Sequence, residues 1–391
     1  MNTIEDTIII LLHDLLDAGQ LNLQNDDFYN IKEDICELLN ETIPEEFIDN
    51  ETITDYIDEI IDNNKQTILQ FNRLYDKEFV KLDKAVITKQ IDYLKHLPQP
   101  EQRTEEWYIF RHKLLTASSA WKAFSSEKIK NALIYEKCKE LDTSKYNHVN
   151  LNAPFHWGNK YEPISIQLYE NKFDTKIEDF GCIKDDIYPF LGASPDGINI
   201  KKNNDKYGVM LEIKNVVSRE ITGIPKFDYW IQMQIQMNVC KLDYCDFLET
   251  KFVEYETKED YLKDGVFNKS IDGKKKGMIM CFMEDNKPKY EYPPIDLEEN
   301  ELIKWENDMM NKNESENTHW LKNIYWKLEV FSCILIKSNK EWFKNAIIIL
   351  KNLYDIIVYE KQHGYEHRAS KKQERKKIIF TPPFSGCVIQ I

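Results

Sequence analysis

The sequence predicts an α/β protein with an acidic, α-helical N-terminal region. From about residue 98 to about residue 255, stretches with helical periodicity alternate with short strand-like stretches, which is the pattern of an α/β core. The 391 residues are 42% hydrophobic and 12% aromatic, ordinary values for a globular protein with one large core and a smaller additional domain. Residues 1–97 contain short amphipathic helical patterns instead.

The formal net charge of -15 is concentrated at one end of the chain. Residues 1–64 contain 18 Asp and Glu against one Lys, whereas the remaining 327 residues contain 51 Lys and Arg against 49 Asp and Glu. The acidity of the whole chain therefore does not exclude an anionic partner, because most of the chain is close to neutral. Arginine is rare, with six residues in all, so each arginine in a motif is informative.

Two prolines in the polar stretch LPQPEQ, residues 97–102, mark the clearest boundary in the chain. We therefore predict three parts: an acidic helical region at residues 1–97, an α/β domain at residues 98–360 and a basic tail at residues 361–391. Within the domain, KLEVFSCILI predicts a strand and KEWFKNAIIILKNLYDIIVYEKQ predicts a long amphipathic helix.

The N-terminus and the cysteines predict an intracellular protein without a membrane anchor. The apolar run from Ile8 to Leu12 follows acidic residues and is far shorter than the roughly 20 residues that a membrane span needs. The eight cysteines are scattered and form no C-x-x-C pair, which is typical of reduced thiols rather than of a zinc ribbon or a disulfide framework.

The strand-like stretch MLEIKNVV, residues 210–217, carries two charges in an apolar context. Side chains two apart on a strand share a face, so Glu212 and Lys214 point the same way. Upstream, a turn at Asp196 and a polar turn at residues 201–206 predict a hairpin that brings Asp196 beside this face. Two carboxylates beside a lysine suit Mg²⁺. The alternative is a solvated face or a cross-strand ion pair.

A helical stretch at residues 156–170 places a third carboxylate on an apolar face. Glu162, Ile166 and Tyr169 are spaced four and three residues apart, so they lie on one side of the helix. A carboxylate there needs a positive partner if it is buried. The alternative is a glutamate near a helix start, stabilised by the helix dipole.

A second helical stretch, DYWIQMQIQMNVCKL, places polar groups opposite apolar ones. Tyr229, Gln232 and Gln236 share one face, and Ile231 and Ile235 lie on the other. The amides are candidates to hold a phosphate or a water molecule, and an exposed polar stripe is the alternative.

A third stretch, RTEEWYIFRHKLLTASSAWKAF, places Arg111 on a helix four residues after Trp107 and ahead of Thr116, Ser118 and Ser119. A serine-rich helix start beside an arginine is a candidate phosphate site, because backbone N–H groups and a bidentate donor converge there. Plain helix capping is the alternative.

Taken together and in this order, these motifs closely resemble the YqaJ-like viral recombinase family. That family includes the phage lambda-type exonucleases of the PD-(D/E)xK nuclease superfamily, and the resemblance, which is to the large-DNA-virus type, covers about residues 103–250. It implies a restriction-endonuclease-like core with a central mixed β-sheet flanked by helices.

The resemblance also implies a role for individual residues. Asp196, Glu212 and the Ile213 backbone carbonyl match metal ligands, Glu162 matches a carboxylate that positions metal or water, and Lys214 matches the catalytic lysine beside the attacking water. Gln232 matches an active-site glutamine with Tyr229 nearby, and Arg111, Ser118 and Ser119 match the pocket for the 5′-phosphate of DNA. The chain departs from many members after the lysine, where Asn215 and Val216 replace Cys-Pro.

The implied function is a Mg²⁺-dependent 5′ to 3′ exonuclease, with Mn²⁺ as a substitute, that acts on ends of double-stranded DNA in viral recombination, repair or genome processing. The implied partner is a single-strand annealing protein, and the implied place is the host cytoplasm, a viral replication site or the nucleus. The oligomeric state is open, with a homo-oligomer among the alternatives. A structure-specific endonuclease of the same superfamily and a non-catalytic DNA-binding protein are the competing readings.

Overall fold

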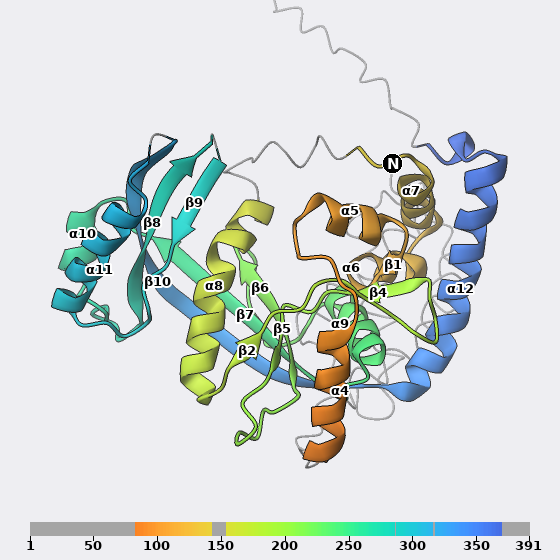
Figure 1. Ribbon diagram of the computed structural model, residues 1–391, viewed down its shortest axis with the longest axis horizontal. Helices are drawn as coiled ribbons and strands as arrows, with labels where there is room; N and C mark the ends of the chain where they lie inside the picture. The colour runs from red at the N-terminus through yellow and green to blue at the C-terminus, as the bar shows by residue number, and fades with distance from the viewer. Residues whose placement is uncertain (1–82, 143–153, 286, 316, 370–391) are drawn as a thin grey trace, which may run out of the picture.

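The computed structural model describes residues 83–142, 154–285, 287–315 and 317–369 (Figure 1). The predicted helices of residues 1–82 and the predicted basic tail from residue 370 onward lie outside the described residues. None of the helices within the described ranges combines the length and the apolar character that a bilayer span requires.

A seven-stranded mixed sheet forms the centre of the molecule (Figure 1). Its strands, in spatial order, are β2 (Ile177–Glu178), β5 (Gly197–Asn199), β6 (Met210–Val216), β7 (Tyr244–Glu254), β10 (Thr318–Lys337), β8 (Lys276–Glu284) and β9 (Lys287–Glu291). Strands β6 and β7 are parallel, and the other neighbours are antiparallel. The predicted mixed sheet flanked by helices is therefore confirmed.

The long strand β10 connects the two halves of the sheet. Its C-terminal part pairs with β7 and its N-terminal part pairs with β8, and the register shifts between Leu328 and Val330 and between Trp320 and Lys322. Such irregularities bend a strand and increase its twist. The strand predicted within KLEVFSCILI is the C-terminal part of β10.

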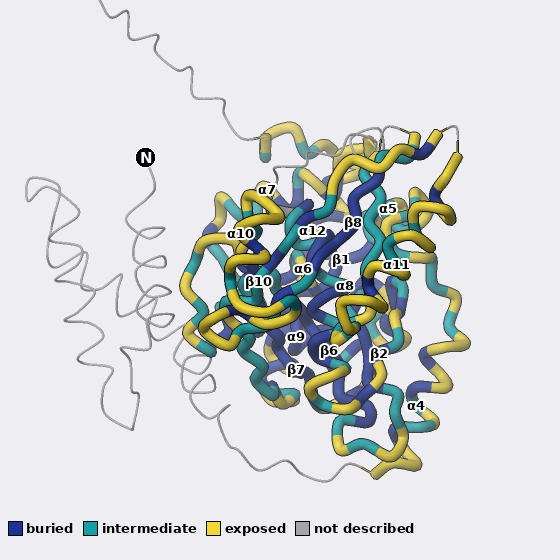
Figure 2. Tube along the Cα trace, turned by 90° about the vertical axis from the view of Figure 1, so that its left-hand side faces the viewer, coloured by how far each residue is buried: buried dark blue, intermediate teal, exposed yellow. Residues whose placement is uncertain are grey.

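The helices α8 (Pro154–Phe173) and α9 (Phe227–Cys240) cover opposite faces of β6. Leu211 and Ile213 pack with Tyr169 of α8, whereas Met210 packs with Trp230 of α9. Since side chains alternate along a strand, these contacts lie on the two faces of β6. Most of β6 is accordingly buried (Figure 2), as expected for a strand with a parallel neighbour. Glu212 consequently faces α9.

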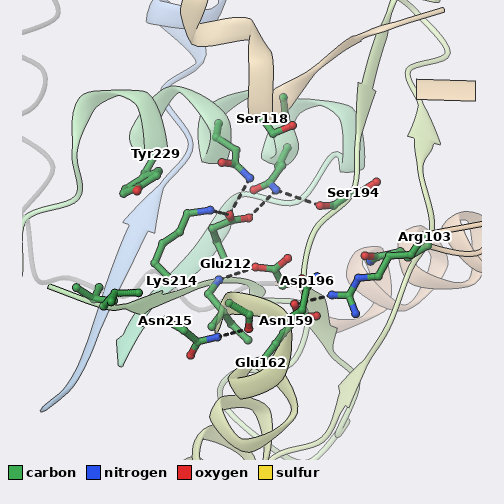
Figure 3. Close-up of a pocket in the computed structure, with 18 of the residues that line it drawn as sticks. Arg103, Ser118, Asn159, Glu162, Ser194, Asp196, Glu212, Lys214, Asn215 and Tyr229 are labelled. Atoms are coloured by element: carbon green, nitrogen blue, oxygen red, sulfur yellow. Dashed lines mark hydrogen bonds and ion pairs between the residues drawn. The ribbon is translucent and has the colours of Figure 1, made fainter. Parts of the chain in front are cut away.

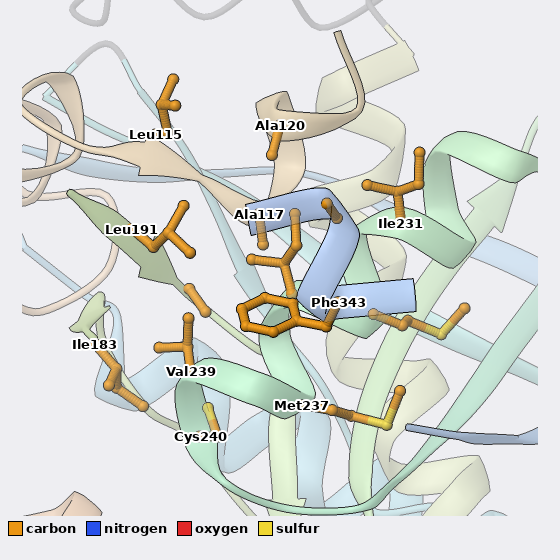
Figure 4. Packing of buried hydrophobic residues seen from close by; sticks show 14 of the residues in the cluster. Leu115, Ala117, Ala120, Ile183, Leu191, Ile231, Met237, Val239, Cys240 and Phe343 are labelled. Carbon is orange, nitrogen blue, oxygen red and sulfur yellow. The ribbon is translucent and has the colours of Figure 1, made fainter. Parts of the chain in front are cut away.

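The α9 side of the sheet carries the largest hydrophobic core, in which residues such as Leu115, Ile231 and Phe343 meet (Figure 4). The elements around it are α4 (Lys84–His96), α5 (Glu105–His112), α6 (Ala117–Ala120), η3 (Trp121–Phe124), α7 (Glu127–Cys138), α12 (Lys340–His363), η5 (Glu366–Arg368) and a small sheet of β1 (Leu115–Thr116), β4 (Leu191–Ala193) and β3 (Ile183–Lys184). The helix predicted in the stretch from residue 340 is α12.

A smaller core supports the other end of the sheet. Met278, Met280 and Phe282 of β8 pack against Leu302 of α11 (Glu299–Lys312). The short helix α10 (Lys258–Lys263) lies at the same end (Figure 1).

Helix α4 precedes the predicted boundary at residue 97, yet it packs into the large core through Ile87, Ile91 and Leu94. Helix α4 also packs against the turn between β5 and β6. Gly208 has φ +83, and a Cβ there would lie 2.3 Å from Cγ2 of Ile87, so this turn needs glycine for both its conformation and its close approach. The core therefore extends upstream of residue 97.

Candidate active site

A pocket of about 680 Å³ opens where β6 ends, between α5, α8 and α9 (Figure 3). Three of the six arginines of the chain line it, namely Arg103, Arg111 and Arg219. The pocket also brings together most of the predicted site residues, which are Glu162, Asp196, Glu212, Ile213, Lys214, Tyr229, Gln232, Arg111 and Ser118.

Glu212 and Lys214 share the pocket face of β6, as the alternation along the strand predicts. The Lys214 ammonium donates to Oε1 of Glu212 at 2.5 Å and lies 4.8 Å from the centre of the Tyr229 ring. Burial lowers the pKa of Lys214, but the charges of Glu212 and Asp196 together outweigh burial and raise it above the usual lysine value. Lys214 is therefore a charged group in this arrangement.

The glutamine face of α9 is buried and contacts the strand carboxylate. Nε2 of Gln232 donates to Oε1 of Glu212 at 2.7 Å, and Nε2 of Gln236 donates to Oε2 at 2.7 Å. Both amides are thus part of the site, and the alternative of an exposed polar stripe is wrong. With three hydrogen bonds accepted, Glu212 keeps one of its roughly four acceptor positions for another ligand.

Asp196 lies in the turn before β5, within the predicted hairpin. Its Oδ2 accepts the backbone N–H of Ile213 at 2.7 Å. Because the N–H and C=O of one strand residue point to the same side, the Ile213 carbonyl is also turned toward Asp196. Burial, followed by the charges of Glu212 and Glu162, holds the pKa of Asp196 well above the usual carboxyl range.

Glu162 lies on α8 immediately before Pro163 and is paired with an arginine. Nη2 of Arg103 donates to Oε2 of Glu162 at 2.8 Å. Burial raises the pKa of Glu162 and the charge of Arg103 opposes that effect. This partner is the positive charge that a carboxylate on an apolar helix face requires.

Arg111 extends from α5 into the pocket. Its guanidinium lies 4.2 Å from the centre of the Trp107 ring and donates to Oγ of Ser194 at 3.0 Å and to Oγ of Ser118 at 2.8 Å. Burial lowers its pKa, as expected for a cation that donates to neutral hydroxyls. Such a group favours an incoming anion.

The serine-rich helix start differs from the prediction in two details. Helix α6 has only four residues, and its N-cap Thr116 makes no side-chain capping bond. Ser118 lines the pocket, whereas Ser119 turns back to the Thr116 carbonyl at 3.1 Å and is not among the lining residues. Near Ser118 the pocket therefore offers side-chain groups to an anion, and not the dipole of a long helix.

Gln236 was predicted as a candidate to hold a phosphate or a water molecule, and in the structure it binds Glu212. Three further pocket residues had no role assigned from the sequence, namely Ser194, Arg103 and Arg219. Ser194 binds Arg111, Arg103 binds Glu162, and Arg219 pairs with Glu249 and lies 5.7 Å from the centre of the Tyr229 ring. The rarity of arginine was the one sequence signal for Arg103 and Arg219. No local pattern pointed to Ser194.

The donor set suits a hard divalent cation in chemistry, although it is not a complete metal cage. Among the described residues, no three His, Cys, Asp or Glu side chains are placed to hold a metal ion. The pocket nevertheless offers oxygen ligands without thiol or imidazole groups. Burial and then the neighbouring carboxylates Glu212 and Glu162 raise the pKa of Asp196, and a cation in the pocket would oppose both effects. Mg²⁺ needs only one or two protein carboxylates when water and phosphate supply its other ligands.

Residues 106–243 match the family model of the YqaJ-like viral recombinase domain. Over this span the chain is similar to the YqaJ-like viral recombinase family. The resemblance seen in the motifs is thereby confirmed, and the matched span of this YqaJ-like domain includes every predicted site residue.

Individual relatives extend beyond that domain. An uncharacterized protein of Acanthamoeba polyphaga mimivirus is 31% identical over 329 residues, which is 74% of this chain, and the chain spans 58% of the length of that relative. Among solved structures, an alkaline exonuclease of Laribacter hongkongensis has a TM-score of 0.40 and 17% identity and covers 66% of this chain and 95% of its own. A phage-related exonuclease of Haemophilus somnus has a TM-score of 0.32 and 13% identity, with coverages of 65% and 96%.

Proposed function

We propose that the protein is a Mg²⁺-dependent nuclease that degrades double-stranded DNA from its ends in the 5′ to 3′ direction. The observation that carries the proposal is the meeting of Asp196, Glu212 and Lys214 in one pocket that also holds Arg111. The YqaJ-like domain supports the same class of reaction. The annealing partner, the oligomeric state and the place in the cell stay predictions.

Asp196, Glu212 and the Ile213 carbonyl would hold the metal ion, which when bound polarises the scissile phosphate and lowers the pKa of a water molecule. Gln232 and Gln236 fix both oxygens of Glu212, so the carboxylate is oriented before substrate arrives. Lys214 holds or accepts a proton at its amine beside Glu212. Arg111 and Ser118 bind the terminal phosphate and place the first phosphodiester near these groups.

The direct test incubates the full-length protein with Mg²⁺ and a blunt, 5′-phosphorylated linear duplex, with a closed circular duplex and an EDTA reaction as controls. We expect mononucleotides from the 5′ end of the linear duplex and an intact circle. Cleavage of the circle would favour the structure-specific endonuclease, and binding without cleavage would favour the non-catalytic DNA-binding protein.

Arg111→Ala is expected to remove the preference for 5′-phosphorylated ends. Arg111 makes charge-assisted contacts with a phosphate in this proposal, each worth about 1.5–3 kcal/mol, which corresponds to an increase in KM of roughly 10- to 100-fold for phosphorylated DNA. The measurement compares KM for 5′-phosphate and 5′-hydroxyl ends. If the variant keeps the wild-type preference, the phosphate pocket lies elsewhere.

Gln236→Leu is expected to reduce activity about 10- to 100-fold, the usual effect of removing a group that orients a metal ligand. The leucine leaves Oε2 of Glu212 without its amide donor, so the Mg²⁺ concentration for half-maximal activity should rise. Gln234→Leu is the matched control, because Gln234 lies on the same helix but binds the backbone of Lys337 and Asn339. It should lower stability without changing the Mg²⁺ requirement, and equal Mg²⁺ curves for both variants would contradict the role of Gln236.

A further inference from the structure

A second cavity, of about 180 Å³, lies behind Arg111 and outside the active-site pocket. It is enclosed by the C-terminal end of α5, the start of β1, α7 and α12, elements that lie together at one end of the molecule (Figure 1). Four of its lining residues are basic, namely His112, Lys113, Lys137 and Lys361, and no Asp or Glu is among the described residues that line it. The cavity therefore concentrates positive charge.

Lys137 is the most unusual of these groups, because it is only 7% exposed. Its ammonium has three donors, and among the described residues its hydrogen-bond partner is the neutral Arg111 carbonyl at 3.0 Å. The adjacent acid, Glu136, is instead paired with Lys122 at 3.3 Å. Buried lysines are normally paired with an acid, so Lys137, which lines the cavity, has donors left for an anion.

The basic groups also repel one another. Burial lowers the pKa of Lys137 to about 8, although Glu136 opposes this, and the charges of Arg111 and Lys122 lower it further. Burial also lowers the pKa of His112, and the charges of Lys137 and Lys361 add to that effect. An anion in the cavity would relieve both effects.

We propose that this cavity, which Tyr354 also lines, binds a phosphate group held by Lys137, His112 and Lys361. Ordinary ligand pockets measure roughly 300–1,000 Å³, so the cavity suits a single phosphate group and not a whole nucleotide. The phosphate is either free inorganic phosphate or a backbone phosphate of a DNA strand. The DNA source rests on the proposed nuclease function, whereas the phosphate site itself does not.

Equilibrium dialysis of the full-length chain with radiolabelled inorganic phosphate at constant ionic strength tests the site. The parent is Arg111→Ala, because the Arg111 side chain is the proposed phosphate ligand of the other pocket, and the substitution keeps the backbone carbonyl that accepts from Lys137. We expect the parent to bind one phosphate. Adding Lys361→Met or His112→Gln should raise the dissociation constant for phosphate by up to about tenfold. Lys344→Met is the control, since Lys344 lies on the same helix but pairs with Glu341. Absence of phosphate binding, or equal binding in all four proteins, would overturn the proposal.

Duplex binding in EDTA, measured with wild type and Lys361→Met over a range of salt concentrations, identifies the source. A backbone phosphate predicts weaker binding of every sequence alike and a salt slope smaller by about one. Free phosphate predicts unchanged DNA affinity together with the loss seen in dialysis. Phosphate binding by a chain that proves to lack nuclease activity would uphold this site while refuting the proposed function.

Discussion

Asp196→Asn is expected to reduce the proposed nuclease activity by more than about 100-fold and, in the absence of metal, to unfold at a higher temperature than the wild type. The loss of activity follows from its place as a metal ligand, since even groups that only orient such ligands are worth about 10- to 100-fold. The gain in stability follows from removing a half-buried carboxylate whose charged form is disfavoured by burial and by the charges of Glu212 and Glu162.

The pH dependence gives the sign of the stability effect. The pKa of Asp196 is higher in the folded chain than in the unfolded chain, so the unfolded state loses this proton first as the pH rises. The contribution of Asp196 to the stability of the wild type should therefore decrease as the pH rises above about 3.9, the usual unfolded value. The amide of the Asp196→Asn variant does not titrate, so the stability advantage of the variant should grow across that range.

Thermal unfolding in EDTA at several pH values, with Asp174→Asn as control, measures the difference. Asp174 forms an exposed pair with Lys201, and such pairs contribute about 0–1 kcal/mol. Added Mg²⁺ should then stabilise the wild type more than Asp196→Asn. A variant that cleaves DNA at the wild-type rate, or one that Mg²⁺ stabilises equally, would remove Asp196 from the metal site.

The central features of the fold and site were accessible from the sequence because they follow from local periodicity. Alternation along β6 placed Glu212 and Lys214 on one face, and the turn residues placed Asp196 beside them. The boundary at residue 97 was less informative, because prolines mark a change of chain direction without showing whether the preceding helix packs on the core. Helix α4 has a buried apolar face, so it packs on the core although it precedes the prolines.

The burial of polar faces was not accessible from the sequence, because an exposed and a buried glutamine stripe have the same spacing. Gln232 and Gln236 are buried since α9 packs on the face of β6 that carries Glu212. The pairing of Arg103 with Glu162 joins residues 59 positions apart, and no periodicity encodes such a contact. Tertiary packing determines both the burial of the two glutamines and the pairing of Arg103 with Glu162. It brings residues from separate motifs together in one site.

Lys214→Arg is expected to lose about 10²- to 10⁴-fold of the proposed activity, the usual contribution of a general base. The guanidinium remains protonated at every accessible pH, whereas the amine of Lys214 can lose its proton. In the metal-free chain the carboxylates of Glu212 and Asp196 keep the pKa of Lys214 high. A cation that neutralised those carboxylates would leave burial as the main influence on Lys214 and would lower the pKa of Lys214. The rate of the wild type should therefore rise with pH, whereas the rate of the Lys214→Arg variant should not change with pH.

Lys206→Arg is a closely matched control for this change. Lys206 pairs with Asp246 at 2.6 Å, with side-chain exposures of 23% and 0%, compared with 25% and 1% for Lys214 and Glu212. The two substitutions therefore impose similar steric and electrostatic changes, but only one of them lies in the pocket. Single-turnover rates across pH, with Lys214→Met as the inactive reference, measure the effect. A Lys214→Arg enzyme within about tenfold of wild type would show that Lys214 acts through its positive charge and not as a base, and a loss of the same size in Lys206→Arg would trace the effect to stability.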